Sequence, residues 1–287
     1  MKNIKPLFCI DITSDKNNQA INGAEFAVRS VEKQKVDEYD AKQSSILATV
    51  EKSQAPLWIQ IIKWLCLLVF IPVISSLIKV GFTKAMQNAP ILVIAGFVCG
   101  IAWLALHIYT KKREKKVLEE EKVEERVEEF DKHLEEMYKE LDIPEDAQNV
   151  DILNFSYKIK KEKIVPHTAN FQLTPYINSD VKIYSNDENM FIADMEDVYA
   201  LKKSEFKSII RVDKRISVPF WHKDEAPNNG KFKPYKMTVN GYGCVIFKPY
   251  YILILEHNGE EMGLYFPCYE LEAFERLTGL RAEVSVK

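Results

Sequence analysis

Acidic residues are missing from the middle of this 287-residue chain. Between Leu57 and Thr110 there is no Asp or Glu, and the only charged residues are Lys63, Lys79 and Lys84. The net charge of -3 therefore conceals a very uneven distribution of charge along the sequence. A stretch of this length that lacks acidic residues is typical of a membrane protein.

Other absences exclude whole classes of function. Glycine is scarce, with ten residues, and the sequence has no glycine-rich phosphate-binding motif. No segment has the sustained excess of Lys and Arg that neutralises nucleic-acid phosphates, so we expect no nucleic-acid partner. The five cysteines form no Cys-x-x-Cys pair, and the five histidines belong to no metal-binding or catalytic motif. We therefore expect no disulfide framework, no metal site, no cofactor and no catalytic residues.

Two apolar stretches have the length of membrane-spanning helices. They cover Leu65–Phe82 and Ile91–Tyr109, each close to the roughly 20 residues that a helix needs to cross a hydrocarbon core. The first helix can begin as early as Leu57, because a lysine near its start can extend its amine to the headgroups while its stem stays in lipid. The sequence predicts a transmembrane helical hairpin over 57–110, closed by a tight external turn at Gly81–Pro90.

The charges beside the spans predict the orientation. Five basic residues directly follow the second span, namely Lys111, Lys112, Arg113, Lys115 and Lys116. Since positively charged loops stay in the cytosol, we expect a two-span protein of the cell membrane with both termini cytoplasmic. These five residues are also the only candidate site residues. We interpret them as a topology signal, and contact with anionic lipid at the membrane surface is the alternative.

A charged helix is predicted after the second span. No Gly or Pro occurs from Lys111 to Leu141. Apolar residues recur there at alternating steps of four and three, namely Val123, Val127, Phe130, Leu134, Met137 and Leu141. This seam predicts one continuous helix in a stalk over 111–146, with Pro144 ending the helix. Two partners for the seam are open: a second copy of the chain in a coiled coil, or the protein's own neighbouring domain.

After Asp151 the pattern changes to short runs of β-branched and aromatic residues separated by turn residues. Strand-like runs lie at 152–159, 181–185, 190–195, 197–202, 208–212, 235–239, 244–248, 250–257 and 261–266. Asn258-Gly259 predicts a tight hairpin, because both turn positions need positive φ. Tyr269–Leu277 is amphipathic, and Gly279 is well placed to end a helix there. The sequence thus predicts an α+β domain over 147–287, in which one helix closes an antiparallel sheet.

Within this domain, Val181–Ile216 (VKIYSNDENMFIADMEDVYALKKSEFKSIIRVDKRI) resembles the bacterial pleckstrin-homology-like domains. The likeness consists of a strand, the polar turn Ser185–Asn189, further strands and the segment Ser204–Ile210. The amphipathic C-terminal helix corresponds to the helix that closes such domains. The resemblance implies a bent antiparallel sheet or partial barrel capped by one helix. It also implies a scaffold that binds peptides, partner domains or lipids, of a kind often attached to paired membrane spans.

The first 56 residues are predicted to be a cytosolic segment made of a strand and a helix. Leu7–Thr13 alternates like a strand, and Val28–Lys52 is charged with sparse apolar residues, as in a helix that leads to the membrane. A single strand of this length is unstable alone. We therefore expect it either to join the edge of the C-terminal sheet or to pair with a second strand at Glu25–Val28.

Together these features predict a membrane-anchored cytosolic interaction or regulatory module that binds a protein partner or a lipid, without catalytic activity. The alternative is a membrane-bound enzyme whose site forms between the N-terminal segment and the C-terminal sheet. A transporter is disfavoured, because the spans carry no carboxylate that could line an ion path. Gly96 and Gly100, with Ala95 and Ala102, would permit close helix packing, so a homo-oligomer formed through the spans or the stalk is open.

Overall fold

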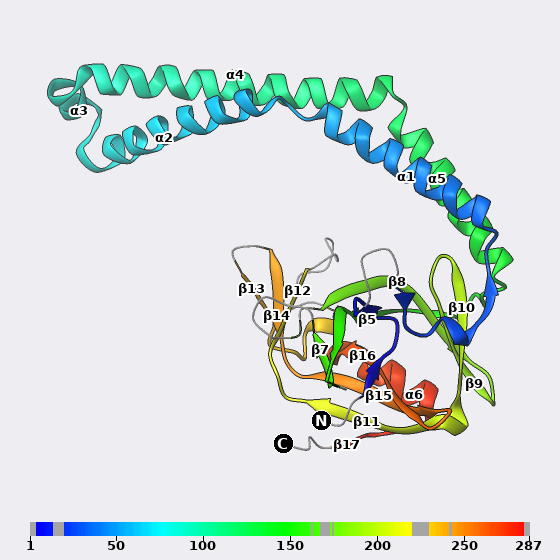
Figure 1. Cartoon of the computed structure of the whole chain (residues 1–287). Coiled ribbons are helices and arrows are strands. Elements are labelled where there is room, and N and C mark those ends of the chain that lie inside the picture. The colour runs from blue at the N-terminus through cyan, green and yellow to red at the C-terminus, as the bar shows by residue number, and fades with distance from the viewer. Residues whose placement is uncertain are drawn as a thin grey trace. The chain divides into compact units, whose positions relative to one another are not determined.

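The computed structural model describes residues 4–13, 20–161, 163–166, 173, 175–219, 230–240 and 243–283. It divides the chain into two compact units (Figure 1). Met1–Glu32 and Glu136–Lys287 form the first, here called the β-unit, and Lys33–Glu135 forms the second, the helical unit. The β-unit combines segments from both ends of the chain. The four parts expected from the sequence are instead consecutive stretches.

The helical unit consists of two long antiparallel arms. The first arm comprises α1 (Lys33–Ser53) and α2 (Leu57–Val80), and the second comprises α4 (Pro90–Glu120) and α5 (Val123–Glu140), which continues into the β-unit. The short helix α3 (Phe82–Asn88) joins the arms, so the prediction of a tight turn without helix was wrong. The reason is local. The seven residues Phe82–Asn88 contain no Gly or Pro, so they form a short helix between the breaks at Gly81 and Ala89.

The helices α2 and α4 are both long and apolar enough to cross a membrane. Each contains an 18-residue window with a mean hydropathy of 2.4. None of the α2 window and only 11% of the α4 window is buried inside the structure, although a soluble core helix would be mostly covered. Both helices are therefore candidate membrane spans. The helix α2 starts at Leu57, the earlier of the two predicted starts.

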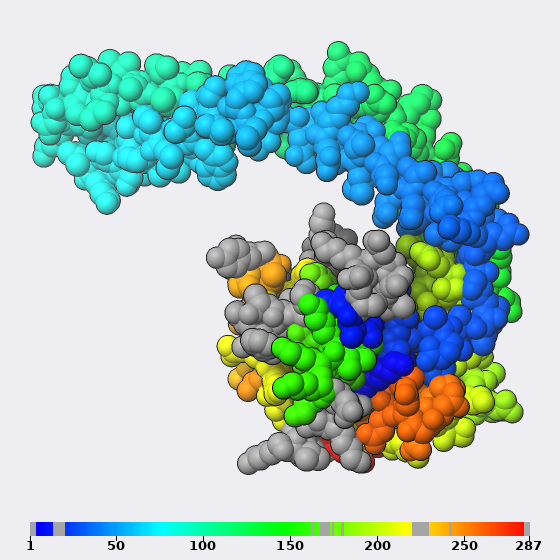
Figure 2. All heavy atoms as spheres, viewed as in Figure 1, coloured from blue at the N-terminus to red at the C-terminus, as the bar shows by residue number. Residues whose placement is uncertain are grey.

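Two glycines allow α2 and α4 to approach closely. A Cβ atom added at Gly96 would lie 2.6 Å from Cγ1 of Val73, and one added at Gly100 would lie 2.6 Å from Cε2 of Phe70. Figure 2 shows the atoms of the two helices in contact. Gly96 and Gly100, which could have allowed close packing with a second copy of the chain, thus pack against α2 of the same chain.

The inward-facing residues of the first arm repeat with a period close to 3.5. The less exposed positions include the series 39, 42, 46, 49, 53, 56, 59, 63, 66, 70, 73 and 77, with further half-buried residues beside it at 35, 36, 55, 67, 74 and 75. This period is that of helices that wrap around one another, and it continues from the charged α1 into the apolar α2. The ring of Tyr39 contacts that of Phe130 on the second arm, with centroids 4.5 Å apart. At Phe130 the predicted seam therefore packs on α1, a partner that was not among the two alternatives.

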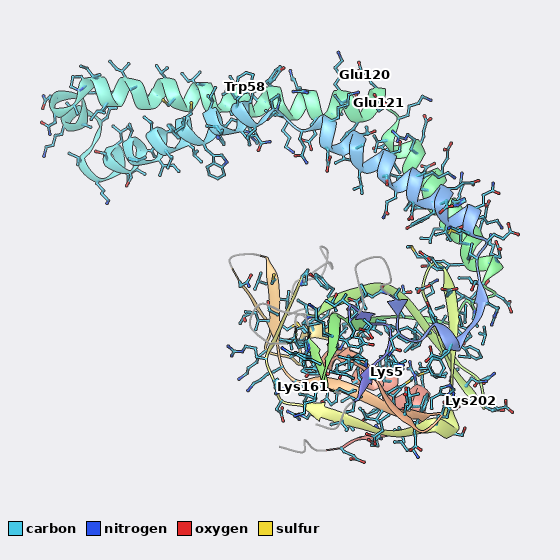
Figure 3. The ribbon with its side chains drawn as sticks, viewed as in Figure 1. Lys5, Trp58, Glu120, Glu121, Lys161 and Lys202 are labelled. Carbon is cyan, nitrogen blue, oxygen red and sulfur yellow. The ribbon has the colours of Figure 1, made fainter. Side chains whose placement is uncertain are left out.

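The predicted continuous helix over the stalk is interrupted at Lys122, which has a φ of 50°. Glu120 and Glu121 mark this junction between α4 and α5 (Figure 3). The phase of the apolar seam explains the interruption. If the helix continued past Val117 with an inward-facing residue every 3.5 positions, glutamates would face inward. The apolar residues of α5 begin only at Val123. A local break turns the apolar residues back toward α1.

The interruption also changes which residues of α5 face α1. Val127, expected in the seam, is 38% exposed. Arg126 takes the inner position instead and donates hydrogen bonds to the hydroxyls of Ser45 (2.6 Å) and Thr49 (3.1 Å). Further along, Met137 and Leu141 belong to the β-unit and are fully buried. The seam thus begins against α1 and ends in the predicted neighbouring domain.

Within its described residues, the β-unit contains four sheets. Its strands are β1 (Lys5–Pro6), β2 (Ile10–Asp11), β3 (Ala20–Ile21), β4 (Ala27–Ser30), β5 (Gln148–Asn154), β6 (Ser156–Lys160), β7 (Lys163–Pro166), β8 (Tyr176–Ser185), β9 (Asn189–Ala193), β10 (Asp197–Lys202), β11 (Phe206–Val212), β12 (Ile216–Pro219), β13 (Thr238–Val239), β14 (Cys244–Phe247), β15 (Tyr250–His257), β16 (Glu260–Pro267) and β17 (Ala282–Glu283). The sheet orders are β1-β16-β15-β11-β17, β4-β10-β9-β8-β5, β12-β14-β13 and β3-β2-β6-β7. The first three sheets share one hydrophobic core, and the α+β class predicted from the sequence is confirmed.

Local sequence signals in the β-unit gave the right structures. Asn258 and Gly259 have φ values of 51° and 82°, and they join β15 to β16 as the predicted hairpin. The closing helix α6 (Leu271–Thr278) ends at Gly279, whose φ is 73°. Its Phe274 is buried and stacks on Phe266 of β16, with ring centroids 4.0 Å apart. Two strand predictions need correction. The run 152–159 is divided between β5 and β6, and only Thr238–Val239 of the run 235–239 is strand.

The N-terminal segment is built into the β-unit. The strand β1 pairs in parallel with β16, β2 pairs in parallel with β6, and β4 pairs antiparallel with β10. Gly263 of β16 makes room for this docking, since a Cβ atom there would lie 2.7 Å from Cγ2 of Ile4. The predicted strand Leu7–Thr13 is strand only at Ile10–Asp11 (β2), which joins β6, and β1 precedes that run and joins β16. The expected docking on the C-terminal sheets is thus confirmed, but the expected bounds of the strand were wrong. The alternative partner at Glu25–Val28 is not used, because β4 is the edge strand of a different sheet, next to β10.

Arg29 links the ends of β4 and α5, which are the two segments at which the chain leaves the β-unit and returns to it. Its guanidinium donates to the carbonyl oxygen of Leu141 (2.6 Å) and to a carboxylate oxygen of Asp142 (3.1 Å). Cations favour the C-terminal end of a helix, where backbone carbonyls lack intrahelical partners. The same side chain therefore caps α5 and fixes the end of β4, which leads into α1.

Gly96→Leu is expected to separate α2 from α4, because the new side chain would overlap Val73. The side chains of Cys66 and Cys99 interact across this helix pair, so mild oxidation in membranes should join them in the wild-type protein. The linked peptides, measured by mass spectrometry after proteolysis, should be lost in the variant. Ala105→Leu adds volume on an exposed position of α4 and should preserve the link. An undiminished yield in Gly96→Leu would contradict the packing.

Leu7→Ala is expected to destabilise the β-unit by about 2–5 kcal/mol, because Leu7 is fully buried and its removal leaves a cavity. Chemical denaturation of the full-length protein in detergent, followed by protease resistance, would measure the shift of the midpoint. Ile21→Ala is the matched control, since Ile21 is 54% exposed and should change stability by less than about 0.5 kcal/mol. Equal effects of both substitutions would show that the N-terminal segment does not contribute to the core.

Candidate functional site

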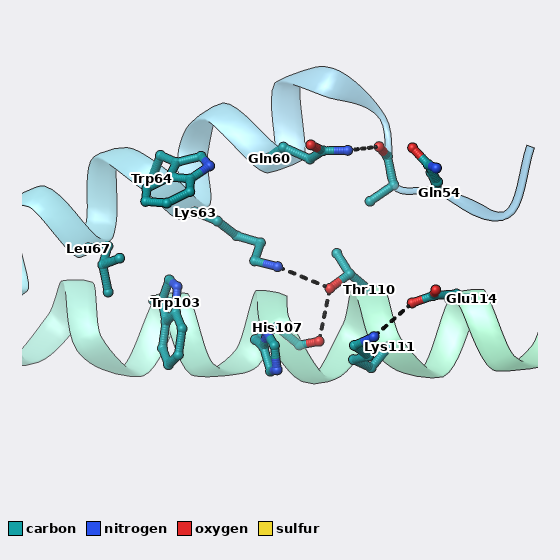
Figure 4. A pocket seen from close by; sticks show the side chains of 11 residues that line it. Gln54, Gln60, Lys63, Trp64, Leu67, Trp103, His107, Thr110, Lys111 and Glu114 are labelled. Atoms are coloured by element: carbon teal, nitrogen blue, oxygen red, sulfur yellow. Dashed lines mark hydrogen bonds and ion pairs between the residues drawn. The ribbon is translucent and has the colours of Figure 1, made fainter. Parts of the chain in front are cut away.

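A pocket opens between the two arms of the helical unit, where α1 gives way to α2. Gln54, Ala55 and Pro56 are not helical, and proline, which has no amide hydrogen, precedes the first residue of α2. The space between this bend and α4 has a volume of about 460 Å³ (Figure 4). Small-molecule sites commonly have volumes in this range.

A chain of polar groups crosses the pocket. The Lys63 ammonium, on α2, donates to Oγ1 of Thr110 on α4 over 3.3 Å. The Thr110 hydroxyl in turn donates to the backbone carbonyl of His107 over 2.9 Å. Gln60 donates to the carbonyl of Ala55 over 2.9 Å and so holds the bend before α2. Lys63 lies about 9 Å along the axis from the start of α2, since each residue of a helix rises about 1.5 Å.

The charges of the pocket do not balance. Glu114 is its one acidic residue, and the carboxylate of Glu114 accepts from Lys111 over 3.2 Å. Lys63 forms no ion pair with any residue in the part of the chain that the structure describes. The pocket therefore carries an excess positive charge, located on an ammonium that is partly removed from water and bonded only to a neutral hydroxyl. Such a group is stabilised by an anion.

Apolar and polar side chains lie at opposite ends of the pocket. Figure 4 shows Leu67, Trp64 and Trp103 at one end, and Gln54 with the Lys111–Glu114 pair at the other. Trp103 stacks on His107, with ring centroids 5.4 Å apart. Tryptophan is enriched at membrane–water interfaces because its ring combines an apolar body with a polar N–H group. The pocket thus changes from polar to apolar along the helix axis.

The five predicted basic residues all lie on α4, but they do not form one basic patch. Lys111 lines the pocket. Lys115 and Lys116 pair with Glu119 and Glu120, each over 3.5 Å, one helical turn further along. Lys112 is exposed and Arg113 is half-buried. Because exposed pairs of this kind contribute little binding energy, they reduce the net charge of the cluster without making it a defined site.

A second group of charged side chains lies in the β-unit and consists of two buried carboxylates and one more exposed lysine. Lys231 lies in a single 3-10 turn (Gly230–Phe232), Asp151 lies on β5, and Glu270 directly precedes α6. The Lys231 ammonium is 2.7 Å from Oε1 of Glu270 and 3.8 Å from Oδ2 of Asp151. The same Glu270 oxygen accepts from the backbone N–H of Asp151 over 3.1 Å. This ion cluster attaches the turn at 230–232 to the core.

Burial shapes the acid–base behaviour of the ion cluster. Burial raises the pKa of Glu270, and the neighbouring Lys231 ammonium opposes that rise. Tyr269 has a raised pKa because it is buried and because Asp151 lies close to its hydroxyl. Lys231 also lies 5.2 Å from the centroid of the Tyr269 ring. We interpret the ion cluster as structural, because two carboxylates share one cation and lie beside a neutral phenol.

The region between the N-terminal segment and the C-terminal sheets is filled by packed side chains. There the ring of Phe26 lies 4.6 Å from that of His257, whose Nδ1 is 3.0 Å from Oε2 of Glu205. Burial raises the pKa of Cys9 to about 12 and that of Cys268 to about 12. Both thiols are therefore protonated at neutral pH, and a thiol in that state is a poor nucleophile.

No group of three or more metal-ligating side chains occurs among the residues that the structure describes. His167 and His222 lie outside those residues. The described cysteines are all free thiols.

Sequence reasoning noticed several residues of the pocket but not the pocket itself. The sequence had placed Lys63, near the start of the first span, at the headgroups, and Lys111 in the basic cluster after the second span. Their meeting depends on the register between α2 and α4, and no local motif encodes that register. The ion cluster was missed altogether, because Asp151 and Glu270 are separated by 119 residues.

Comparison with known proteins gives no relative for this chain: no protein-family model, no curated protein and no solved structure matches it.

Glu270→Gln is expected to flatten the pH dependence of β-unit stability. Because the folded state raises the pKa of Glu270, it binds this proton more readily than the unfolded chain does. The wild-type protein should therefore gain stability from this group as the pH falls from about 7 to about 5. Denaturation midpoints across that range would measure the slope. Glu272→Gln, at an exposed position of α6, should keep the wild-type slope, and an unchanged slope in Glu270→Gln would refute the assignment.

Proposed function

We propose that this protein is a membrane-anchored cytosolic interaction or regulatory module, which binds a protein partner or a lipid. The observation that carries the proposal is the position of the helical unit in the chain, between β4 and β5 of the β-unit. Both ends of the apolar helix pair therefore lead into the same folded unit. A unit connected in this way stays on one side of the membrane and is held there by two helices.

In this proposal α2 and α4 form a transmembrane hairpin, with α3 outside the cytosol. The basic residues Lys111–Lys116 follow the apolar part of α4, and the positive-inside rule assigns that end to the cytosol. The β-unit, and with it both termini, is then cytoplasmic in a protein of the cell membrane. The tryptophans of the pocket lie at the same end, where interfacial tryptophans are favoured.

We also propose a pleckstrin-homology-like fold for the β-unit. The strands β5, β8, β9 and β10 are successive antiparallel neighbours in one sheet. They are followed by β11, β15 and β16 in a second sheet and then by α6, which packs on β16. Four strands, three strands and a closing helix in this order support the resemblance. The N-terminal strands, the hairpin β6–β7 and the strands β12–β14 are additions to that plan.

An exposed apolar pair on the β-unit favours a protein partner. Ile10 and Ile21 lie opposite each other on β2 and β3, and they are 37% and 54% exposed. Contiguous apolar residues on a surface are typical of interaction sites. The second candidate partner, a lipid, is supported by the pocket in the helical unit.

The interaction role predicts that a photo-crosslinking amino acid at Ile21 captures a partner in native membranes. The full-length protein should yield an adduct of constant mass, identified by mass spectrometry, that disappears when Ile10 is changed to Asp. The same amino acid at Glu260, an exposed residue on another sheet, is the control and should yield no such adduct. Crosslinks between two copies of this chain would identify a homo-oligomer. The absence of any adduct from position 21 would contradict a partner at this surface.

A further inference from the structure

We propose that the pocket between the Pro56 bend and α4 binds the phosphate-bearing headgroup of an anionic phospholipid, with Lys63 as its main ligand. This inference rests on the proposed function, because it requires α2 and α4 to span a membrane with the pocket at the cytosolic interface. It goes beyond that function by naming the class of lipid and the residues that hold it.

The first argument is the state of Lys63. Its ammonium is partly buried on an otherwise apolar helix, and its one hydrogen bond, to the hydroxyl of Thr110, is long at 3.3 Å. An ammonium offers three donors, so two of them can reach a further acceptor without breaking this bond. The Glu114 carboxylate is already paired with Lys111. An external anion is therefore the group that would complete the site.

The second argument is the shape and polarity of the pocket. Lys63 lies between the apolar end, with Trp64, Leu67 and Trp103, and the polar end, with Gln54 and Lys111 (Figure 4). A phospholipid has the same succession of groups, because its acyl chains meet a glycerol, a phosphate and then a polar headgroup. The apolar end continues onto the exposed faces of α2 and α4, where acyl chains would lie in the membrane.

The third argument concerns the alternatives to a phospholipid. A free anion such as inorganic phosphate would satisfy Lys63 but would leave the exposed ring of Trp64 in the pocket wall without a partner. A zwitterionic phospholipid carries the same phosphate, but its headgroup cation would meet the positive charge of Lys63, which has no carboxylate partner among the described residues, whereas Lys111 is already paired with Glu114. An anionic headgroup has no such cation and matches the excess charge of the pocket.

The test compares lipid retention by variants of the full-length protein. Wild-type protein, purified in detergent and supplied with phosphatidylglycerol or phosphatidylcholine, should retain phosphatidylglycerol preferentially, as counted by native mass spectrometry. Lys63→Gln should weaken phosphatidylglycerol binding about tenfold, the loss expected for one charge-assisted hydrogen bond. Lys63→Arg should restore the preference. Lys79→Gln removes the same charge near the other end of α2 and should leave binding unchanged.

Several results would overturn the inference. Equal retention of phosphatidylglycerol by Lys63→Gln and the wild-type protein would exclude Lys63 as a ligand. An equal loss in Lys79→Gln would show a general charge effect without a site. Full displacement of the lipid by inorganic phosphate would identify a free-anion site. Alkaline extraction of membranes separates these failures from that of the proposed function: release of the protein would refute the membrane anchor and the lipid site together, whereas retention without Lys63 dependence would refute the lipid site alone.

Discussion

Backbone hydrogen bonds between the N-terminal strands and the C-terminal sheets set the connectivity of the whole molecule. The strand β1 pairs with β16 and β4 pairs with β10, so the β-unit is closed by both ends of the chain. Everything between β4 and β5 must then leave the β-unit and return to it, and Arg29 fixes the two passages by bonding the end of α5 beside β4. Without this docking, the chain would be a simple series of segments. With it, the apolar helix pair is an insertion in one folded unit.

The same constraint acts on the helical unit. Because the first arm starts at the β-unit and the second arm returns to it, the charged helices α1 and α5 lie side by side. They share a seam with a period near 3.5, which continues into α2. The break at Lys122 keeps apolar residues on that seam where one uninterrupted helix would have turned glutamates inward. The bend at Pro56 has the opposite effect, since it parts the arms and leaves room for the pocket. Helix packing and the proposed lipid site thus have one origin, the register of two antiparallel arms.

Local patterns predicted the elements of this protein well. The apolar runs became α2 and α4, Asn258-Gly259 became a hairpin with two positive φ values, and Gly279 ended the last helix. These features depend on interactions between residues close in sequence, such as helix hydrogen bonds, turn conformations and the length of an apolar run. The two errors have different causes. The segment 81–90 contains a short helix because no Gly or Pro interrupts Phe82–Asn88, which is a local effect. The stalk helix is interrupted because its seam must match α1, which distant packing decides.

The candidate site shows the same division. The sequence by itself determined which residues carry the chemistry: one lysine in an apolar stretch, tryptophans near its ends and a basic run after it, because composition and spacing along a helix are local properties. Only the tertiary structure decided that Lys63 meets Thr110 and that Lys111 is neutralised by Glu114. It also decided that Asp151, Lys231 and Glu270 form one ion cluster. These contacts depend on the register between arms and on the closure of the sheets. Both are fixed by packing between residues far apart in the chain, which no local pattern of side chains encodes.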